Sequence, residues 1–106
     1  MPLTIKIKKE AEFITVATLQ LHGLARLPKL ATVSGRGTFK DAETYAMIRQ
    51  IFFDGTVKDY QIVIPDCSVI EGPFQVTYLD YVGKRNGEAV YDLSFESAGM
   101  LTIEGR

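Results

Sequence analysis

The sequence has little of the chemistry on which most enzymes and metal sites depend. Its 106 residues include one cysteine, Cys67, and one histidine, His22. A single cysteine excludes an internal disulfide. One histidine and one cysteine cannot supply the usual nitrogen and sulfur ligands of a transition-metal site, and nothing in their spacing pairs them as a nucleophile and its base. We therefore expect no catalytic residues and no metal.

The sequence also lacks a strong charge and a long hydrophobic run. The net charge of −1 does not predict a nucleic-acid partner. No apolar stretch approaches the roughly 20 residues of a membrane span, and residues 1–7 lack the apolar block of a signal peptide. With 46% hydrophobic residues, the composition is that of one globular domain over residues 1–106. We expect a protein that is made and kept in a cytoplasm.

The clearest positive signal is a long β-hairpin over residues 72–99. Its turn is Asn86-Gly87, which lies between two runs of alternating apolar and polar residues. Asn-Gly favours a type I′ turn because both central residues take φ > 0, and such a two-residue loop fixes the strand register. The predicted cross-strand pairs are Arg85 with Glu88, Val82 with Tyr91, Asp80 with Leu93, and Tyr78 with Phe95.

This register divides the hairpin into an apolar and a polar face, with exceptions near the turn. Asp80 lies on the apolar face, whereas Leu79, Tyr81 and Val90 lie on the polar face. Because apolar residues lie on both faces near the turn, we expect another chain to cover this end of the hairpin. The predicted apolar face consists of Phe74, Val76, Tyr78, Val82, Ala89, Tyr91, Leu93 and Phe95.

The remaining chain predicts mostly short strands with one helix. The helix covers residues 41–53, with Asp41 as its N-cap and Gly55 as a left-handed C-terminal cap. Gly35 and Gly37 within one strand predict a bulge or a close approach of another backbone. The strands are expected at residues 3–7, 13–21, 31–39, 58–64, and 100–103, with a loop of about five residues after the first, an irregular loop at 22–30 and another at 66–72.

Strands on both sides of a single helix favour antiparallel pairing. We therefore predict a mainly β fold of the α+β kind: an antiparallel β-sandwich or open barrel of about six to seven strands, flanked by the helix at 41–53.

An ordered series of segments resembles the major tail proteins (tail-tube proteins) of long-tailed phages, most closely the branch found in gene transfer agents of α-proteobacteria. The resemblance covers residues 31–103. It rests on Gly35–Ala42, Arg49–Gly55, Ile62–Asp66, Glu71–Val76, Gly87-Glu88, Tyr91–Leu93 and Glu96–Gly99.

The resemblance implies a structural subunit of a virion tail or phage-like particle. Such a subunit is made and assembled in the bacterial cytoplasm, is not an enzyme and binds no cofactor. Such subunits form hexameric rings with copies of themselves, and the rings stack with other tail proteins into a tube. DNA passes through the tube only as non-specific cargo, and neither a membrane nor a small-molecule substrate is involved. For this chain we expect subunit contacts at Leu79, Tyr81, Val90 and Arg36.

Two alternatives stay open at this point. Relative to the family, the N-terminal segment (residues 1–30) is expected to be shortened, which favours a prophage remnant that does not polymerise or an adaptor similar to a tail terminator. A small ligand- or oligonucleotide-binding barrel is the third possibility, because Tyr78, Tyr81 and Tyr91 could stack on bases. No basic stripe accompanies these tyrosines, so packing is the favoured role.

Overall fold

A computed structural model describes residues 2–27, 30–65 and 68–105 of the chain. The described residues form seven strands and one helix, so the predicted mainly β fold is confirmed. In chain order the elements are β1 (Pro2–Lys9), β2 (Glu12–Leu27), β3 (Leu30–Phe39), α1 (Ala42–Asp54), β4 (Val57–Ile64), β5 (Ser68–Arg85), β6 (Glu88–Ser97) and β7 (Thr102–Gly105).

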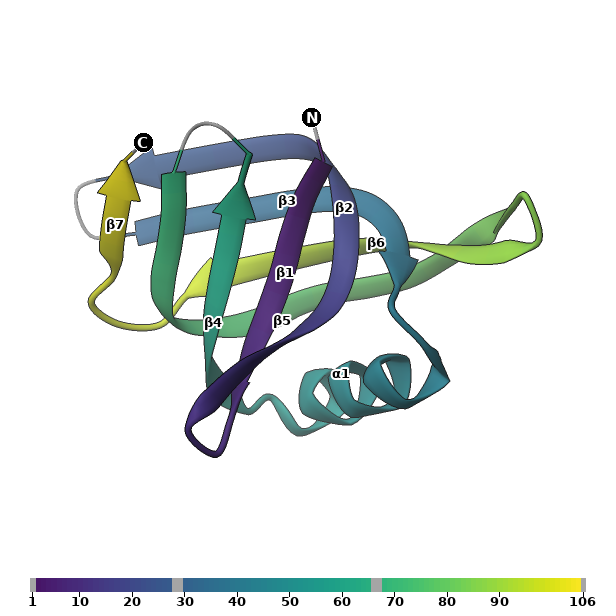
Figure 1. The fold of residues 1–106 in the computed structure, drawn as a ribbon, viewed down its shortest axis with the longest axis horizontal. Helices are drawn as coiled ribbons and strands as arrows, with labels where there is room; N and C mark the ends of the chain where they lie inside the picture. Colours follow the sequence, from purple (N-terminus) through teal and green to yellow (C-terminus); the bar gives the residue numbers. More distant parts are fainter. Residues whose placement is uncertain (1, 28–29, 66–67, 106) are drawn as a thin grey trace.

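All strand pairings among the described residues are antiparallel and belong to one sheet, in the order β4-β1-β2-β3-β6-β5-β7. The first half of β5 pairs with β4, and its second half pairs with β6. The sheet therefore curls back on itself through the long strands, and α1 covers one flank (Figure 1). The result is an open, sandwich-like wrap and not a closed barrel.

Alternation along the strands places the core inside this wrap. Leu3, Ile5 and Ile7 of β1 are buried, as their spacing predicts. The other buried hydrophobic residues are Val16, Ala17, Leu19, Ala31, Val33, Ile48, Ile51, Tyr60, Ile62, Ile64, Ile70, Phe74, Val76, Leu93 and Phe95.

The caps of α1 confirm the sequence prediction. The Asp41 carboxylate accepts a hydrogen bond from the Thr44 backbone N–H at 2.8 Å, and the Asp41 N–H donates to the Thr44 hydroxyl at 3.1 Å. This reciprocal pair is a capping box, and it lowers the pKa of Asp41. Gly55 ends the helix with φ of 66°. At 13 residues, this helix of the described chain is too short to span a membrane.

The two glycines of β3 lie where another backbone comes very close. A Cβ on Gly37 would stand 1.9 Å from the Thr18 carbonyl oxygen, and one on Gly35 would stand 2.6 Å from that of Gln20. The predicted close approach is therefore confirmed, and its cause is the tight packing of β2 against β3.

The structure corrects three loop predictions. Residues 22–27 continue β2, and β3 begins at Leu30, so the predicted irregular loop is instead mostly a hairpin. Pairing with β3 outweighs the local effect of Gly23. The turn between β1 and β2 has two residues, Glu10 and Ala11, and not about five. β5 begins at Ser68, which leaves only Asp66 and Cys67 of the predicted 66–72 loop, and these lie outside the described residues.

Candidate subunit interface

The end of the β5–β6 hairpin extends beyond the curled sheet (Figure 1). We call residues 82–90 the arm. Asn86 and Gly87 at its tip have φ of 52° and 83°, which confirms the predicted turn. β6 pairs with β3 only from Tyr91 onward, and β4 pairs with β5 only up to Gln75. In the described chain, the arm is therefore a ribbon of two strands that pair only with each other.

Two bulges in β5 change the register that the turn predicts. The pairing of Arg85 with Glu88 is confirmed. Between Gly83 and Tyr81 the register shifts, so that Tyr81 and not Val82 lies opposite Tyr91. The same shift places Leu79 opposite Leu93, and a second shift at Thr77 places Val76 opposite Phe95. The predicted partners of Val82, Asp80 and Tyr78 are therefore wrong, because each extra residue on one strand moves the rest of that strand by one position.

The shifted register explains the unexpected face of Asp80. Leu79 turns inward and packs against the core, whereas Tyr78 and Asp80 turn outward. Tyr81 shares the inner face with Leu79 but is 52% exposed. Val90 lies on the opposite face, next to the outward-facing Asp92. The prediction that Leu79, Tyr81 and Val90 share one face is therefore wrong, and the roles of these residues in subunit contact stay predictions.

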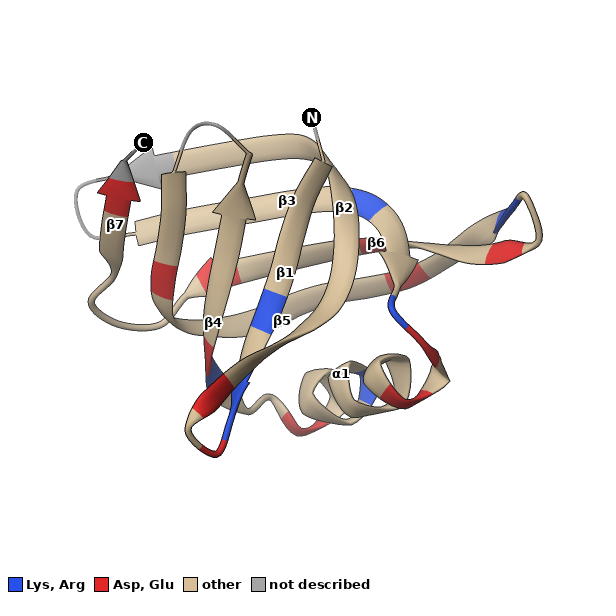
Figure 2. Cartoon of the chain, viewed as in Figure 1, with Lys and Arg blue, Asp and Glu red and all other residues tan. Residues whose placement is uncertain are grey.

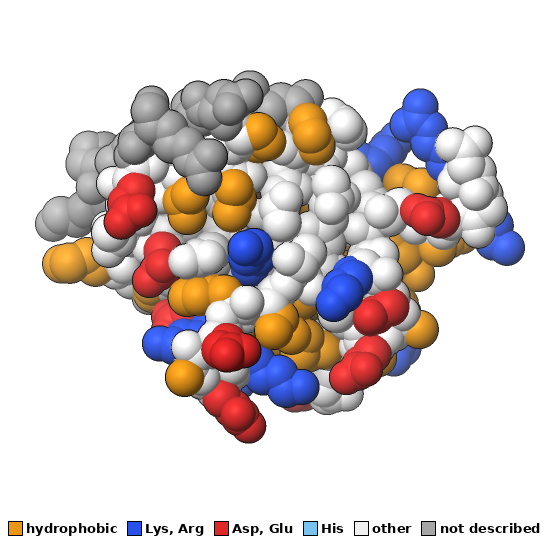
Figure 3. Space-filling model, in the orientation of Figure 1, with side chains coloured by type: hydrophobic (Ala, Val, Ile, Leu, Met, Phe, Trp, Pro, Cys, Tyr) orange, Lys and Arg blue, Asp and Glu red, His pale blue; other side chains and the backbone are white. Residues whose placement is uncertain are grey.

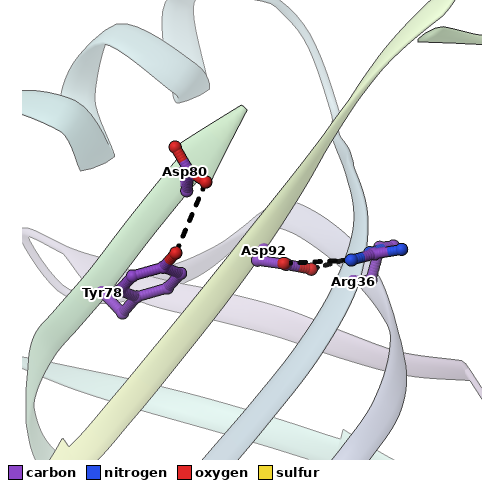
Figure 4. A network of polar contacts seen from close by, with 4 residues as sticks. All are labelled: Arg36, Tyr78, Asp80 and Asp92. Carbon is purple, nitrogen blue, oxygen red and sulfur yellow. Dashed lines mark hydrogen bonds and ion pairs between the residues drawn. The ribbon is translucent and has the colours of Figure 1, made fainter. Parts of the chain in front are cut away.

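A row of polar contacts crosses the outer face of the sheet (Figure 4). Arg36 on β3 donates from Nε and Nη2 to the two carboxylate oxygens of Asp92 on β6, at 2.7 and 3.1 Å. These bonds lower the pKa of Asp92 and raise the pKa of Arg36. Asp80 lies directly opposite Asp92 and accepts a hydrogen bond from the Tyr78 hydroxyl at 3.4 Å.

A shallow groove of about 710 Å³ lies between the arm and the outer face of β2 and β3. Two of the four predicted contact residues, Arg36 and Val90, line it, and Leu79 and Tyr81 do not. The groove is lined by Thr18, Leu19, Gln20, His22, Arg36, Gly37, Thr38, Val82, Gly83, Lys84, Arg85, Asn86, Glu88 and Val90.

A cluster of aromatic rings lies below the base of the arm. Tyr91 stacks on Tyr45 of α1 with ring centroids 4.8 Å apart, and Phe39 meets both rings edge-on at 5.2 and 5.3 Å. Tyr81 contacts Tyr91 edge-on at 5.6 Å. The cluster therefore joins the helix to the strands at the base of the arm. The sequence places Tyr91 only within the hairpin, because the contacts with Phe39 and Tyr45 come from distant parts of the chain.

Apolar side chains are also exposed away from the hairpin. Phe53 is 67% exposed at the end of α1, where the Arg49 guanidinium lies 5.1 Å from its ring centroid. Met100 is 92% exposed in the connection between β6 and β7, and not in a strand as its sequence context predicts. Orange patches over several elements in Figure 3 show that apolar side chains reach the surface of this face.

The described residues include no group of three or more His, Cys, Asp or Glu side chains placed to hold a metal ion. Their notable surfaces are the arm, the groove, the aromatic cluster and the exposed apolar side chains. Such surfaces are suited to contacts between protein chains.

Comparisons with known proteins also point to proteins that assemble. A family model described as phage tail tube protein matches residues 4–103. One similar solved structure is a chain in the tail of an empty gene transfer agent particle, computed with helical refinement and C6 symmetry. It has a TM-score of 0.71 and 35% identity, and the match covers 96% of this chain and 95% of that chain.

A second similar structure is a chain in the virion of a native gene transfer agent particle. It has a TM-score of 0.67 and 34% identity, again covering 96% of this chain and 95% of that one. A search of curated proteins found no match. The family match spans nearly the whole sequence, and the structural matches extend over the same length. The chain therefore belongs to the phage tail tube protein family.

Proposed function

We propose that this protein is a tail-tube subunit that assembles into hexameric rings, and that the rings stack into a channel through which DNA passes as non-specific cargo. The observation that carries the proposal is the match, over 96% of the chain, to a tail solved with sixfold symmetry. On this proposal, the protein acts in the tail of a gene transfer agent or similar phage-like particle, and its partners are copies of itself and other tail proteins.

Two open strand edges supply a means of joining subunits. Among the described residues, β1 pairs with β2 only as far as Gln20, and residues 21–27 of β2 pair with β3 alone. At the other edge of the four strands β2-β3-β6-β5, the described part of β5 beyond Gln75 pairs with β6 alone. Unpaired N–H and C=O groups at such edges favour pairing with another chain. In a ring, the β5 edge of one subunit would meet the β2 edge of the next.

This arrangement satisfies the geometry of a ring. A contact between two different surfaces of the same subunit repeats around a closed ring, and no edge stays open once the ring is complete. The sheet would then continue across all the subunits. The outward-facing row that includes Arg36 and Asp92 would repeat once in each subunit.

Light scattering after size-exclusion chromatography, combined with negative-stain electron microscopy, tests the proposal. We expect particles of six times the 11.8 kDa chain mass, or stacks of such particles. Leu24 lies on the open β2 edge and is 45% exposed, so Leu24→Lys should prevent ring formation without unfolding the chain. Phe53→Lys is the control, because Phe53 is 67% exposed on α1 and belongs to neither strand edge.

The outcomes separate the possible functions. Rings that persist in Leu24→Lys would contradict the β2 edge as a contact. A wild-type protein that stays monomeric at all concentrations would contradict the proposal and leave the non-polymerising remnant. A single ring that never stacks would favour the terminator-like adaptor.

A further inference from the structure

The two open edges of the strands β2-β3-β6-β5 have few of the charges that protect an exposed edge. Among the described side chains, residues 21–25 of β2 include no Asp, Glu, Lys or Arg, and residues 76–83 of β5 include only Asp80 (Figure 2). Charged side chains on an edge strand hinder its pairing with another chain. Each neighbouring pair among the four strands is antiparallel, so β2 and β5 also run antiparallel to each other. The edges of two copies can therefore join as an antiparallel pair.

The lengths of the two edges limit the register of this pair. The open edge of β2 covers residues 21–27, and that of β5 covers residues 76–85 in the described chain. Within these ranges the bulged residues take no cross-strand partner, and they are His22, Thr77 and Val82. With the bulges counted in this way, three registers keep the whole β2 edge within the β5 edge. They place Asp80 opposite residue 24, 25 or 26.

Only the middle register keeps the two faces of the sheet separate. Leu24 lies on the inner face, opposite the fully buried Val33, so the exposed Ala25 lies on the outer face with Asp80. A shift of one position in either direction would turn every side chain of one strand to the wrong face. The middle register pairs Asp80 with Ala25 outside, and Tyr81 with Leu24 inside.

This register brings together two exposed apolar side chains. Leu24 is 45% exposed and Tyr81 is 52% exposed, although both point to the inner face that carries the core. Each lies one strand away from a better-covered neighbour, Val33 for Leu24 and Tyr91 for Tyr81. Contact between two copies would remove both side chains from water and continue the core across the seam.

The same register gives the strands the tilt of a closed barrel. Within one copy, Asp80 lies in one cross-strand row with Gln20, through β6 and β3. The step from Gln20 to Ala25 covers four paired positions, because His22 is bulged. A stagger of four positions over four strands corresponds to a tilt of about 35°, given a rise of about 3.3 Å per residue and about 4.8 Å between strands. Strands of closed barrels tilt by about 35–45°.

We infer that β5 of one copy pairs with residues 21–27 of the next copy in this register, with Tyr81 packed against Leu24 on the inner face and Asp80 opposite Ala25 on the outer face. The inference rests on the proposed assembly, and it adds the register and the side chains of the seam between the same two edges. The Asp80 carboxylate stays in contact with water in this arrangement, because its partner is a small side chain on the outer face.

Disulfide cross-linking in the assembled protein tests the register. In a chain with Cys67→Ser, the pair Leu24→Cys and Tyr81→Cys places two thiols directly opposite each other across the seam, whereas β3 and β6 separate them within one chain. Mild oxidation should give a ladder of covalent oligomers from dimer to hexamer on a denaturing gel. Leu24→Cys with Leu79→Cys is the register control and should cross-link more slowly, because Leu79 shares the edge and the face of Tyr81 but lies two positions away.

Paired charges provide an independent measurement. Leu24→Lys or Tyr81→Asp alone should raise the protein concentration needed for assembly by about tenfold or more, because each places a charge in an apolar contact. The two substitutions together should lower this concentration again by about threefold, because opposite charges directly across a strand pair attract each other. Leu24→Lys with Met100→Asp is the matched control and should show no such recovery, since Met100 is 92% exposed and belongs to neither edge.

The failures of the two proposals are distinguishable. Wild-type rings without a ladder from the Leu24 and Tyr81 pair, or with a ladder that forms as fast from the Leu79 pair, would overturn the register and leave the proposed function standing. The same holds if the paired charges bring no recovery, or if Met100→Asp brings an equal one. The absence of any wild-type assembly would overturn both proposals.

Discussion

The curled sheet and the arm are built from the same strands, yet they depend on different interactions. In the sheet, the inner halves of β5 and β6 carry Phe74, Val76, Leu93 and Phe95, which are at most 2% exposed. Beyond the bulge at Val82, the described residues of the same two strands are mostly exposed and pair only with each other. A two-stranded ribbon is marginally stable in water. The difference indicates that the sheet stabilises the subunit, whereas the arm is available for contacts between subunits.

Truncating a core side chain of the sheet should cause the greatest loss of stability. Leu93 is 1% exposed and packs in the core. Leu93→Ala should lower the free energy of unfolding by about 2–5 kcal/mol, measured by urea denaturation. Val82→Ala in the arm should change it by less than about 0.5 kcal/mol, because Val82 is 39% exposed. Equal effects at both positions would remove the distinction between the two regions.

Glycine substitutions separate the two regions in a second way. Gly37→Ala forces a Cβ against the Thr18 carbonyl oxygen and should lower the global unfolding free energy by about 1–3 kcal/mol. Gly83 has open space around it but a φ of 145°, so Gly83→Ala strains the bulge of the arm without a clash. Hydrogen exchange should show faster exchange confined to the arm. If Gly83→Ala increased hydrogen exchange throughout the molecule, the arm would not be independent of the sheet.

A third prediction concerns a polar group inside the sheet. The Tyr60 ring meets Phe74 and Phe95 edge-on, and its buried hydroxyl has no hydrogen-bond partner among the described residues. Burial also raises the pKa of this hydroxyl. Tyr60→Phe should therefore leave stability unchanged or raise it by about 1 kcal/mol. Tyr78→Phe is the control on the outer face, and a clear loss of stability in Tyr60→Phe alone would reveal a partner for this hydroxyl.

The smallest change in stability is expected from substitutions on the outer face of the sheet. Arg36 lowers the pKa of Asp92 below its value in the unfolded chain. The contribution of this ion pair is therefore present above about pH 4 and is lost as the pH falls through the folded-state pKa. Because the pair is exposed, Asp92→Asn should only slightly reduce the amount by which the free energy of unfolding falls at acid pH. A large change near neutral pH would contradict this assignment.

The parts of the fold that were predicted correctly depend on local signals. Asn86-Gly87 specifies its turn through φ, and Asp41 and Gly55 specify the ends of α1 through capping. The register failed at Thr77 and Val82 because a strict two-residue period contains no information about bulges. The strand at 22–27 was missed for a similar reason, since its pairing with β3 is tertiary.

The four residues predicted to contact another subunit lie in different places, and their role in contact stays a prediction. Arg36 and Val90 line a common groove, whereas Leu79 packs against the core. The aromatic cluster could not be predicted, because Phe39, Tyr45 and Tyr91 come from β3, α1 and β6 and meet only after folding. Residues that contact another chain also carry no local pattern of their own. The exposure of Met100 became visible only once its neighbours were placed.

Electron microscopy of the purified protein at high concentration decides whether the chain builds a tail tube. We expect end-on views of rings with sixfold symmetry, and side views in which the rings stack into tubes. Monomers at every concentration, or rings of a different symmetry, would contradict the proposed tail-tube assembly.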